Sequence, residues 1–159
     1  MSKLKICMVG DFSVGKTSLT QKFVNNVFSE KYLTTIGVKI DTASVGDTKL
    51  IVWDVAGRDS LSPINSSYLV GASGVVLVGD GTRPHTIEDL FEIWQTVTRR
   101  IGDVPVVVAL NKADLDEWQV DDELTDTLVN NGWQVFNTSA KDGANVAELF
   151  QTLVDEIQN

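Results

Sequence analysis

The chain has 159 residues, with 13 Lys+Arg against 22 Asp+Glu and a formal net charge of −9. Its length and its 43% of hydrophobic residues fit one domain whose core needs no disulfide or metal. The acidic balance excludes nonspecific binding to nucleic acid or to an anionic membrane, although local N–H groups and a lysine can still hold a phosphate ligand. No apolar run is long enough to span a membrane, and the single cysteine, Cys7, favours a reducing, cytoplasmic compartment.

Apolar runs alternate with segments of helical period along the whole chain. The patterns predict, in chain order, a strand at 4–9, a helix at 16–26, strands at 38–45, 49–54 and 74–79, a helix at 86–101, a strand at 104–110, a helix at 121–131, a strand at 133–137 and a helix at 144–157. This order is typical of an α/β fold with a mostly parallel sheet and helices on both faces. Because Gly46-Asp47 is a tight-turn signal, the second and third strands are predicted to form an antiparallel hairpin at one edge.

The composition of individual segments adds three expectations. The last three strands are rich in β-branched and aromatic residues, so we expect them to be buried on both faces. The least periodic segments, 27–37 and 55–65, are predicted to be functional or mobile loops. The acidic stretch 114–123 is interpreted as a solvated face, in which Trp118 is a candidate contact for a partner.

Residues 10–17, GDFSVGKT, fit the pattern GxxxxGK[ST] where the first strand gives way to the first helix. In this pattern the glycines let the loop wrap closely, and successive N–H groups and the helix N-terminus point at phosphates. Lys16 would add a charge at the β and γ positions, and the Thr17 hydroxyl can ligate Mg²⁺. The segment therefore predicts a nucleotide phosphate site, with an ordinary Gly-rich turn as the alternative.

Residues 53–57, WDVAG, place an aspartate at the end of the third strand. The Asp54 carboxylate can hold a water ligand of a metal, and the Gly57 amide can approach a γ-phosphate that a Cβ would obstruct. Carboxyl ends of neighbouring strands converge in such a sheet. We therefore expect Asp54 beside the phosphate loop, with Mg²⁺ as cofactor of a bound nucleotide.

Residues 111–114, NKAD, follow the predicted fifth strand, and residues 138–141, TSAK, follow the sixth. Guanine offers two adjacent N–H donors, and a carboxylate such as Asp114 can accept both, whereas adenine would leave it unpaired. The second segment can supply a backbone N–H to guanine O6. Taken alone, residues 111–114 could be a turn with a helix cap, but together the motifs predict a guanine site.

The motifs GDFSVGKT, TTIGV, WDVAG, NKAD and TSAK stand in the order and at the spacings of the Ras-like small GTPases, and the chain resembles the Rab branch most closely. This resemblance covers essentially the whole chain. It implies one G domain over residues 1–159, a three-layer P-loop NTPase with a six-stranded, mostly parallel sheet, one antiparallel edge strand and about five helices. It also implies a GTP-binding switch that hydrolyses GTP, with signal transduction and vesicle trafficking as its setting.

The resemblance further implies roles for single residues. Phe28 matches the aromatic that contacts guanine, Tyr32 the tyrosine that closes over the phosphates, and Thr35 the threonine of the Mg²⁺ shell. A core aromatic at Phe28 and an ordinary loop residue at Thr35 remain alternatives. The expected nucleotide-binding residues are Ser13, Val14, Gly15, Lys16, Thr17, Ser18, Phe28, Tyr32, Thr35, Gly57, Asn111, Lys112, Asp114, Ser139, Ala140 and Lys141. The expected metal ligands are Thr17, Thr35 and Asp54, and the expected catalytic residues are Lys16, Thr35, Gly57 and Arg58.

The expected partners are effectors, exchange factors and GTPase-activating proteins, which would bind residues 27–45 and 55–68 of a monomer. Family members that act on membranes extend past the last helix into a tail with a lipidated cysteine, whereas this chain stops at Asn159. We therefore expect a cytoplasmic protein that meets membranes only through a partner or through a tail absent from this chain.

Two residues depart from the family pattern. Arg58 stands where a glutamine usually orients the attacking water, and a guanidinium cannot accept a hydrogen bond. Phe12 stands where a small residue lies beside the γ-phosphate. We expect slow hydrolysis, with an Arg58 guanidinium that simply lies in solvent as the alternative for that residue. A nucleotide-bound interaction module with little turnover remains an alternative function. An ATP-dependent kinase or ATPase shares the phosphate loop but not the guanine motifs.

Overall fold

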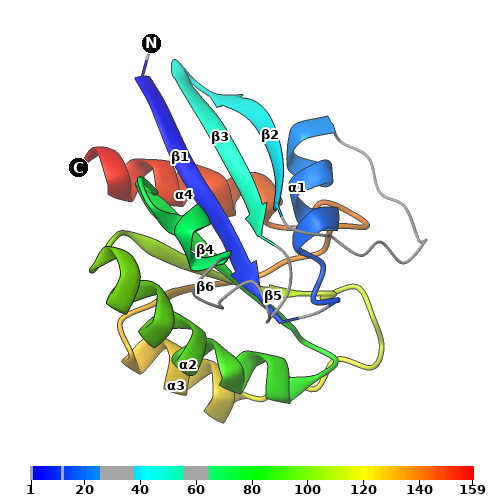
Figure 1. Ribbon diagram of the computed structural model, residues 1–159. Helices are drawn as coiled ribbons and strands as arrows, with labels where there is room; N and C mark the ends of the chain where they lie inside the picture. Colours follow the sequence, from blue (N-terminus) through cyan, green and yellow to red (C-terminus); the bar gives the residue numbers. More distant parts are fainter. Residues whose placement is uncertain (1, 12, 26–37, 56–64) are drawn as a thin grey trace.

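A computed structural model describes residues 2–11, 13–25, 38–55 and 65–159 of the chain. Within these ranges it contains six strands, four α-helices and one 3₁₀ helix (Figure 1). The elements in chain order are β1 (Ser2–Gly10), α1 (Lys16–Asn25), β2 (Val38–Val45), β3 (Thr48–Val55), η2 (Asn65–Leu69), β4 (Gly74–Asp80), α2 (Pro84–Ile101), β5 (Val106–Asn111), α3 (Asp122–Asn130), β6 (Gln134–Asn137) and α4 (Val146–Gln158).

All six strands form one sheet in the order β2-β3-β1-β4-β5-β6. Every neighbouring pair is parallel except β2 and β3, which pair antiparallel from Val38 opposite Val55 to Val45 opposite Thr48. The predicted hairpin at one edge is therefore confirmed. Gly46 makes its turn possible, because its φ of 57° lies in the left-handed region that suits a two-residue hairpin.

Side chains of β1 alternate between two cores, one on each face of the sheet. Ile6 and Met8 face α1 and α4, whereas Cys7 and Val9 face η2, α2 and α3. Figure 1 shows α2 and α3 together on one side of the sheet. Cys7 is fully buried and burial raises the pKa of its thiol to about 11, so it is a core residue. The first core also contains Leu19, Leu50, Leu149, Phe150 and Leu153, and the second contains Leu77, Leu90, Leu128 and Trp133.

Two helices begin at other residues than the sequence predicts, because local backbone chemistry sets where each helix starts. Helix α2 begins at Pro84, two residues early, because the first helical position tolerates a missing N–H. Helix α4 begins at Val146, two residues late, because Asn145 before it has a φ of 58°. The expectation that the sixth strand is buried on both faces is wrong: β6 is an edge strand whose residues are half-buried or exposed. No helix in the described ranges is long and apolar enough to cross a membrane.

The strand order sets where polar residues meet. Asp80 at the end of β4 is in register with Asn111 at the end of β5, and Asp54 on β3 is in register with Met8 on the central strand β1. Gly10 ends β1 between them, opposite Val78. Motifs that are far apart in the sequence thus reach one edge of the sheet.

Candidate functional site

The phosphate loop, residues 10–17, leaves β1 and enters α1 at this edge. Two of its residues have positive φ, 57° at Ser13 and 101° at Gly15. A Cβ on Gly15 would overlap the side-chain amide of Asn111, so the position also needs glycine for space. The loop is therefore shaped by its glycine and packed against the end of β5. Its Val14 side chain is fully buried, which fixes the loop to the core.

Lys16 folds back over the phosphate loop. Its Nζ donates to the carbonyl oxygens of Gly10 at 3.3 Å and Asp11 at 3.1 Å. Only 6% of the residue is exposed. Burial lowers the pKa of Lys16, while the carboxylates of Asp54 and Asp11 partly raise it. A buried ammonium in this position favours an anionic ligand, because the negative charge of a phosphate would compensate for the hydration that the ammonium loses on burial.

Thr17 and Asp54 meet where the phosphate loop passes the end of β3. The Thr17 hydroxyl donates to Asp54 Oδ2 at 2.5 Å, and the aspartate is fully buried. Hydroxyl and carboxylate oxygens are the hard ligands that Mg²⁺ prefers, usually together with substrate phosphates and water. The two side chains therefore fit the donor set of a magnesium site beside a phosphate ligand.

The NKAD segment begins at the end of β5, where Asn111 is buried. Asn111 Nδ2 donates to Val14 O at 3.0 Å, and its Oδ1 accepts from Thr138 Oγ1 at 3.3 Å. This one side chain joins the phosphate loop to the TSAK segment. Lys112, which follows, has a φ of 70°, uncommon for a residue with a Cβ.

Asp114 is exposed, as the acceptor of a ligand's N–H groups must be. Ser139 Oγ donates to Asp114 Oδ1 at 2.8 Å and accepts from the Asp142 backbone N–H at 3.2 Å. The carboxylate is therefore held by the TSAK segment. Ala140 beside Ser139 is buried and Lys141 is exposed.

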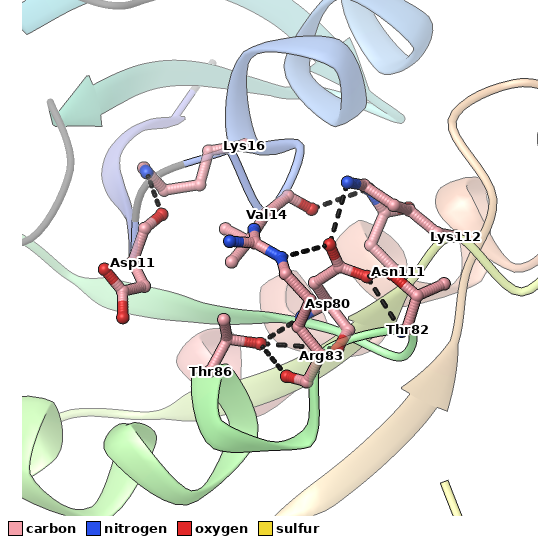
Figure 2. Close-up of polar contacts among 9 residues, drawn as sticks. All are labelled: Asp11, Val14, Lys16, Asp80, Thr82, Arg83, Thr86, Asn111 and Lys112. Atoms are coloured by element: carbon pink, nitrogen blue, oxygen red, sulfur yellow. Dashed lines mark hydrogen bonds and ion pairs between the residues drawn. The ribbon is translucent and has the colours of Figure 1, made fainter. Parts of the chain in front are cut away.

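A cluster centred on Asp80, a residue that no sequence motif included, lies next to these segments (Figure 2). The Asp80 carboxylate, fully buried, binds Lys112 Nζ at 2.8 Å and Arg83 Nε at 2.9 Å through Oδ2. Its Oδ1 accepts from the backbone N–H and the hydroxyl of Thr82, at 2.8 and 2.7 Å. Burial alone would raise the pKa of Asp80, but hydrogen bonds from Lys112, Thr82 and Arg83 hold it below its ordinary value.

The signal for Asp80 was present in the sequence. It ends the buried run of residues 74–80, GVVLVGD, just as Asp54 and Asn111 end theirs. A polar residue at the carboxyl end of a buried parallel strand is a candidate site residue by position alone. Without a motif around Asp80, the position was not sufficient to single it out.

The structure brings most of the expected nucleotide residues together. The residues of the phosphate loop, of NKAD and of TSAK lie at the same sheet edge, and Ser18 lies in the first turn of α1. The remaining expected residues, Phe28, Tyr32, Thr35, Gly57 and Arg58, lie outside the described residues, as does Phe12.

The chain is similar to known proteins along nearly its whole length. Residues 5–159 match the sequence profile of the Ras family. Ras-related protein Rab-1A of Dictyostelium discoideum is 36% identical over 162 aligned residues, which cover 98% of this chain and 80% of the relative. Ras-related protein SEC4 of Saccharomyces cerevisiae is 34% identical, covering 99% and 76% respectively. Ras-related protein Rab-1 of Theileria parva is 34% identical, covering 98% and 74%.

Proposed function

The chain belongs to the Ras family, in its Rab branch, and from this membership we propose that it is a small GTPase that binds GTP or GDP with Mg²⁺ and switches partner binding. The observation that carries the proposal is the contact of Asn111 Nδ2 with Val14 O. It joins a phosphate loop to a segment whose carboxylate suits guanine. A phosphate loop alone could bind other nucleotides, and residues 111–114 alone could be an ordinary turn. Together they form a site that suits a guanine nucleotide.

Lys16, the loop N–H groups and the N-terminus of α1 would bind the phosphates. Thr17, Asp54 and Thr35 would hold Mg²⁺, which, when bound, supplies positive charge beside the phosphate oxygens. Asp114 would accept the two N–H donors of guanine. GTP hydrolysis would then proceed by in-line attack of water, with the charge on the phosphates stabilised by Lys16 and the loop amides.

Partner binding would respond to the nucleotide through residues 27–45 and 55–68. Among the described residues of these segments, Ile40 is 50% exposed on β2, opposite Trp53 on β3. The Trp53 ring lies 6.2 Å from that of Tyr68. An apolar surface here would suit effectors, exchange factors and activating proteins, as the Rab resemblance implies. A monomeric state, a cytoplasmic location and a role in vesicle trafficking belong to the same proposal.

A second function is favoured by Arg58 and Phe12, the two departures from the family pattern. Because an arginine cannot accept a hydrogen bond from the attacking water, hydrolysis by this chain would be slow. In the extreme case the chain would be a nucleotide-bound interaction module with little turnover. The two functions use the same nucleotide site and differ only in the rate at which bound GTP is hydrolysed.

The test is the identity of the nucleotide that copurifies with the protein, released by heat and separated by chromatography. We expect GDP or GTP, and competition of GDP and ADP against a fluorescent guanine nucleotide should favour GDP. Equal competition by ADP would refute the proposed site. Radiolabelled GTP, followed alone and with candidate activating proteins, would separate the two functions, since persistence of GTP in both conditions would favour the interaction module.

A further inference from the structure

The segment after β4 is the support on which the NKAD loop rests. We call residues 112–121, between β5 and α3, the base loop. Gly81 N donates to Asn111 O at 2.9 Å where the base loop begins, and Gln119 N donates to Gly81 O at 2.8 Å where it returns. Both ends of the loop are therefore hydrogen-bonded around one residue.

Trp118 packs on this support. A Cβ on Gly81 would overlap the indole ring of Trp118, so only a glycine leaves room for it. The ring belongs to the apolar cluster under α2 and α3 and is half-buried. Trp118 therefore has an anchoring role inside the chain, and the contact of its exposed part with a partner stays a prediction.

Asp80 provides a polar anchor beside this apolar one. Its carboxylate is fully buried, and a buried charge is tolerated when cations and hydrogen bonds compensate it. Two cations share its Oδ2, Lys112 at 2.8 Å from the base loop and Arg83 at 2.9 Å from the segment after β4 (Figure 2). Thr82 occupies the other oxygen. The carboxylate is thereby fixed, and it in turn fixes Lys112.

Lys112 is the base-loop residue that most needs such support. Its φ of 70° is a conformation that residues with a Cβ adopt only when their surroundings impose it. Ala113 N, next along, donates to Thr138 O at 2.9 Å, and Asp114 follows with its bond from Ser139. The position of Asp114 therefore depends on the backbone direction set at Lys112.

We propose that Asp80 is a positioning residue of the nucleotide site: through Lys112 it holds the base loop, and with it Asp114, in the geometry that receives guanine before the nucleotide arrives. The guanine part of this inference rests on the proposed function. The ordering of the loop by Asp80 rests only on the contacts above, so the two can be tested separately.

The test compares Asp80→Asn, Lys112→Met, the double variant and the control Arg83→Ala with the wild-type chain. The control removes the other cation from the same carboxylate oxygen without touching the base loop. Hydrogen exchange of nucleotide-free protein reports on the amides of Ala113, Leu115, Trp118 and Gln119, all of which are hydrogen-bonded in the structure. Dissociation of a fluorescent methylanthraniloyl-GDP reports on the nucleotide site.

We expect Asp80→Asn and Lys112→Met each to speed exchange in residues 113–119 and to raise the GDP dissociation rate about tenfold, as for the loss of one charge-assisted hydrogen bond. In the exchange of these amides the double variant should equal either single one, because both changes remove the same ion pair. Arg83→Ala should leave exchange of these amides and GDP dissociation at wild-type values. Exchange in the phosphate loop should stay unchanged in all variants.

Three results would overturn the role of Asp80. They are unchanged exchange of the base loop in Asp80→Asn, additive effects on that exchange in the double variant, and the same change of exchange in Arg83→Ala as in Asp80→Asn. Should Asp80→Asn not fold, Lys112→Met breaks the same pair from its more exposed side, and normal exchange in that variant would refute the proposal. Absence of GDP binding by the wild type would refute the proposed function, while the exchange data would still decide the role of Asp80.

Discussion

The side-chain amide of Asn111 donates to the backbone carbonyl of Val14 at 3.0 Å, across 97 positions of sequence. Asn111 is 2% exposed, so water competes little for this bond. Through it the phosphate loop and the base loop share one support. A change that displaces the Asn111 side chain itself should therefore alter binding at both ends of a bound nucleotide.

Gly15→Ala tests this contact from the phosphate side. Gly15 has a φ of 101°, and the added Cβ would meet the Asn111 amide. Gly46→Ala is the matched control, because Gly46 has a φ of 57° but open space around it, far from the site. Gly46→Ala should lose about 1–2 kcal/mol of unfolding free energy from backbone strain, and Gly15→Ala should lose more, because its Cβ also overlaps the Asn111 side chain. Only Gly15→Ala should weaken GDP binding more than about tenfold, as measured by titration, and equal affinities of the two variants would contradict the assignment.

Asp114→Asn tests the choice of base. An asparagine offers one acceptor and one donor, so it cannot accept both N–H groups of guanine but matches the N–H and carbonyl of xanthine. We expect GDP affinity to fall by about 10³-fold or more and XDP affinity to rise. Asp116→Asn, an exposed neighbour in the base loop, is the control and should bind GDP like the wild type. A variant that kept its preference for GDP would remove Asp114 from the base site.

Arg58 and Phe12 are tested together by single-turnover hydrolysis of GTP. The double variant Phe12→Gly, Arg58→Gln should hydrolyse GTP about 10–100-fold faster than the native chain, because an amide can both accept from and donate to the attacking water. Arg58→Ala is the control, since it removes the arginine without supplying a group that orients water. An unchanged rate in the double variant would show that neither Phe12 nor Arg58 slows hydrolysis.

Asp80 should make folding stability depend on pH in the acid range. Its pKa in the folded chain lies below the ordinary 3.8, so the folded state binds fewer protons than the unfolded state. The stabilisation is therefore fully present above pH 3.8 and is lost as pH falls through the lower folded pKa. Asp80→Asn should lower the unfolding free energy by about 1–2 kcal/mol at neutral pH, since both cations are partly exposed. Its loss of stability on acidification should be smaller than that of the wild type and of Asp116→Asn, and parallel urea-unfolding curves would contradict this.

Phe150 should contribute most to the core beneath α4. It is fully buried and stacks on Phe23 with ring centroids 3.9 Å apart. Phe150→Ala should lower the unfolding free energy by about 3–5 kcal/mol. Phe91→Ala, which removes a half-buried ring stacked on Trp133 at 5.0 Å, should cost less. Chemical unfolding would show the order, and a larger loss for Phe91→Ala would be inconsistent with this packing.

The sequence alone determined the elements, their mostly parallel order and the three motifs of the site. These features are local: apolar periodicity places strands and helices, and the loop patterns at 10–17 and 111–114 carry their chemistry within a few residues. Even the meeting of motifs was predictable, because parallel strands place their carboxyl ends at one edge.

Only the tertiary structure decided how the motifs are held. Three contacts join residues that lie at or after the ends of different strands. They are the ion pair of Asp80 with Lys112, the packing of Trp118 on Gly81, and the hydrogen bond from Asn111 to Val14. No local pattern encodes such contacts, because they depend on which strands become neighbours and in which register. The edge position of β6, and hence its exposure, was likewise fixed by strand order. Sequence motifs and hydrophobic periodicity identified the segments that form the site. The geometry of these loops is set by side-chain contacts between the ends of neighbouring strands.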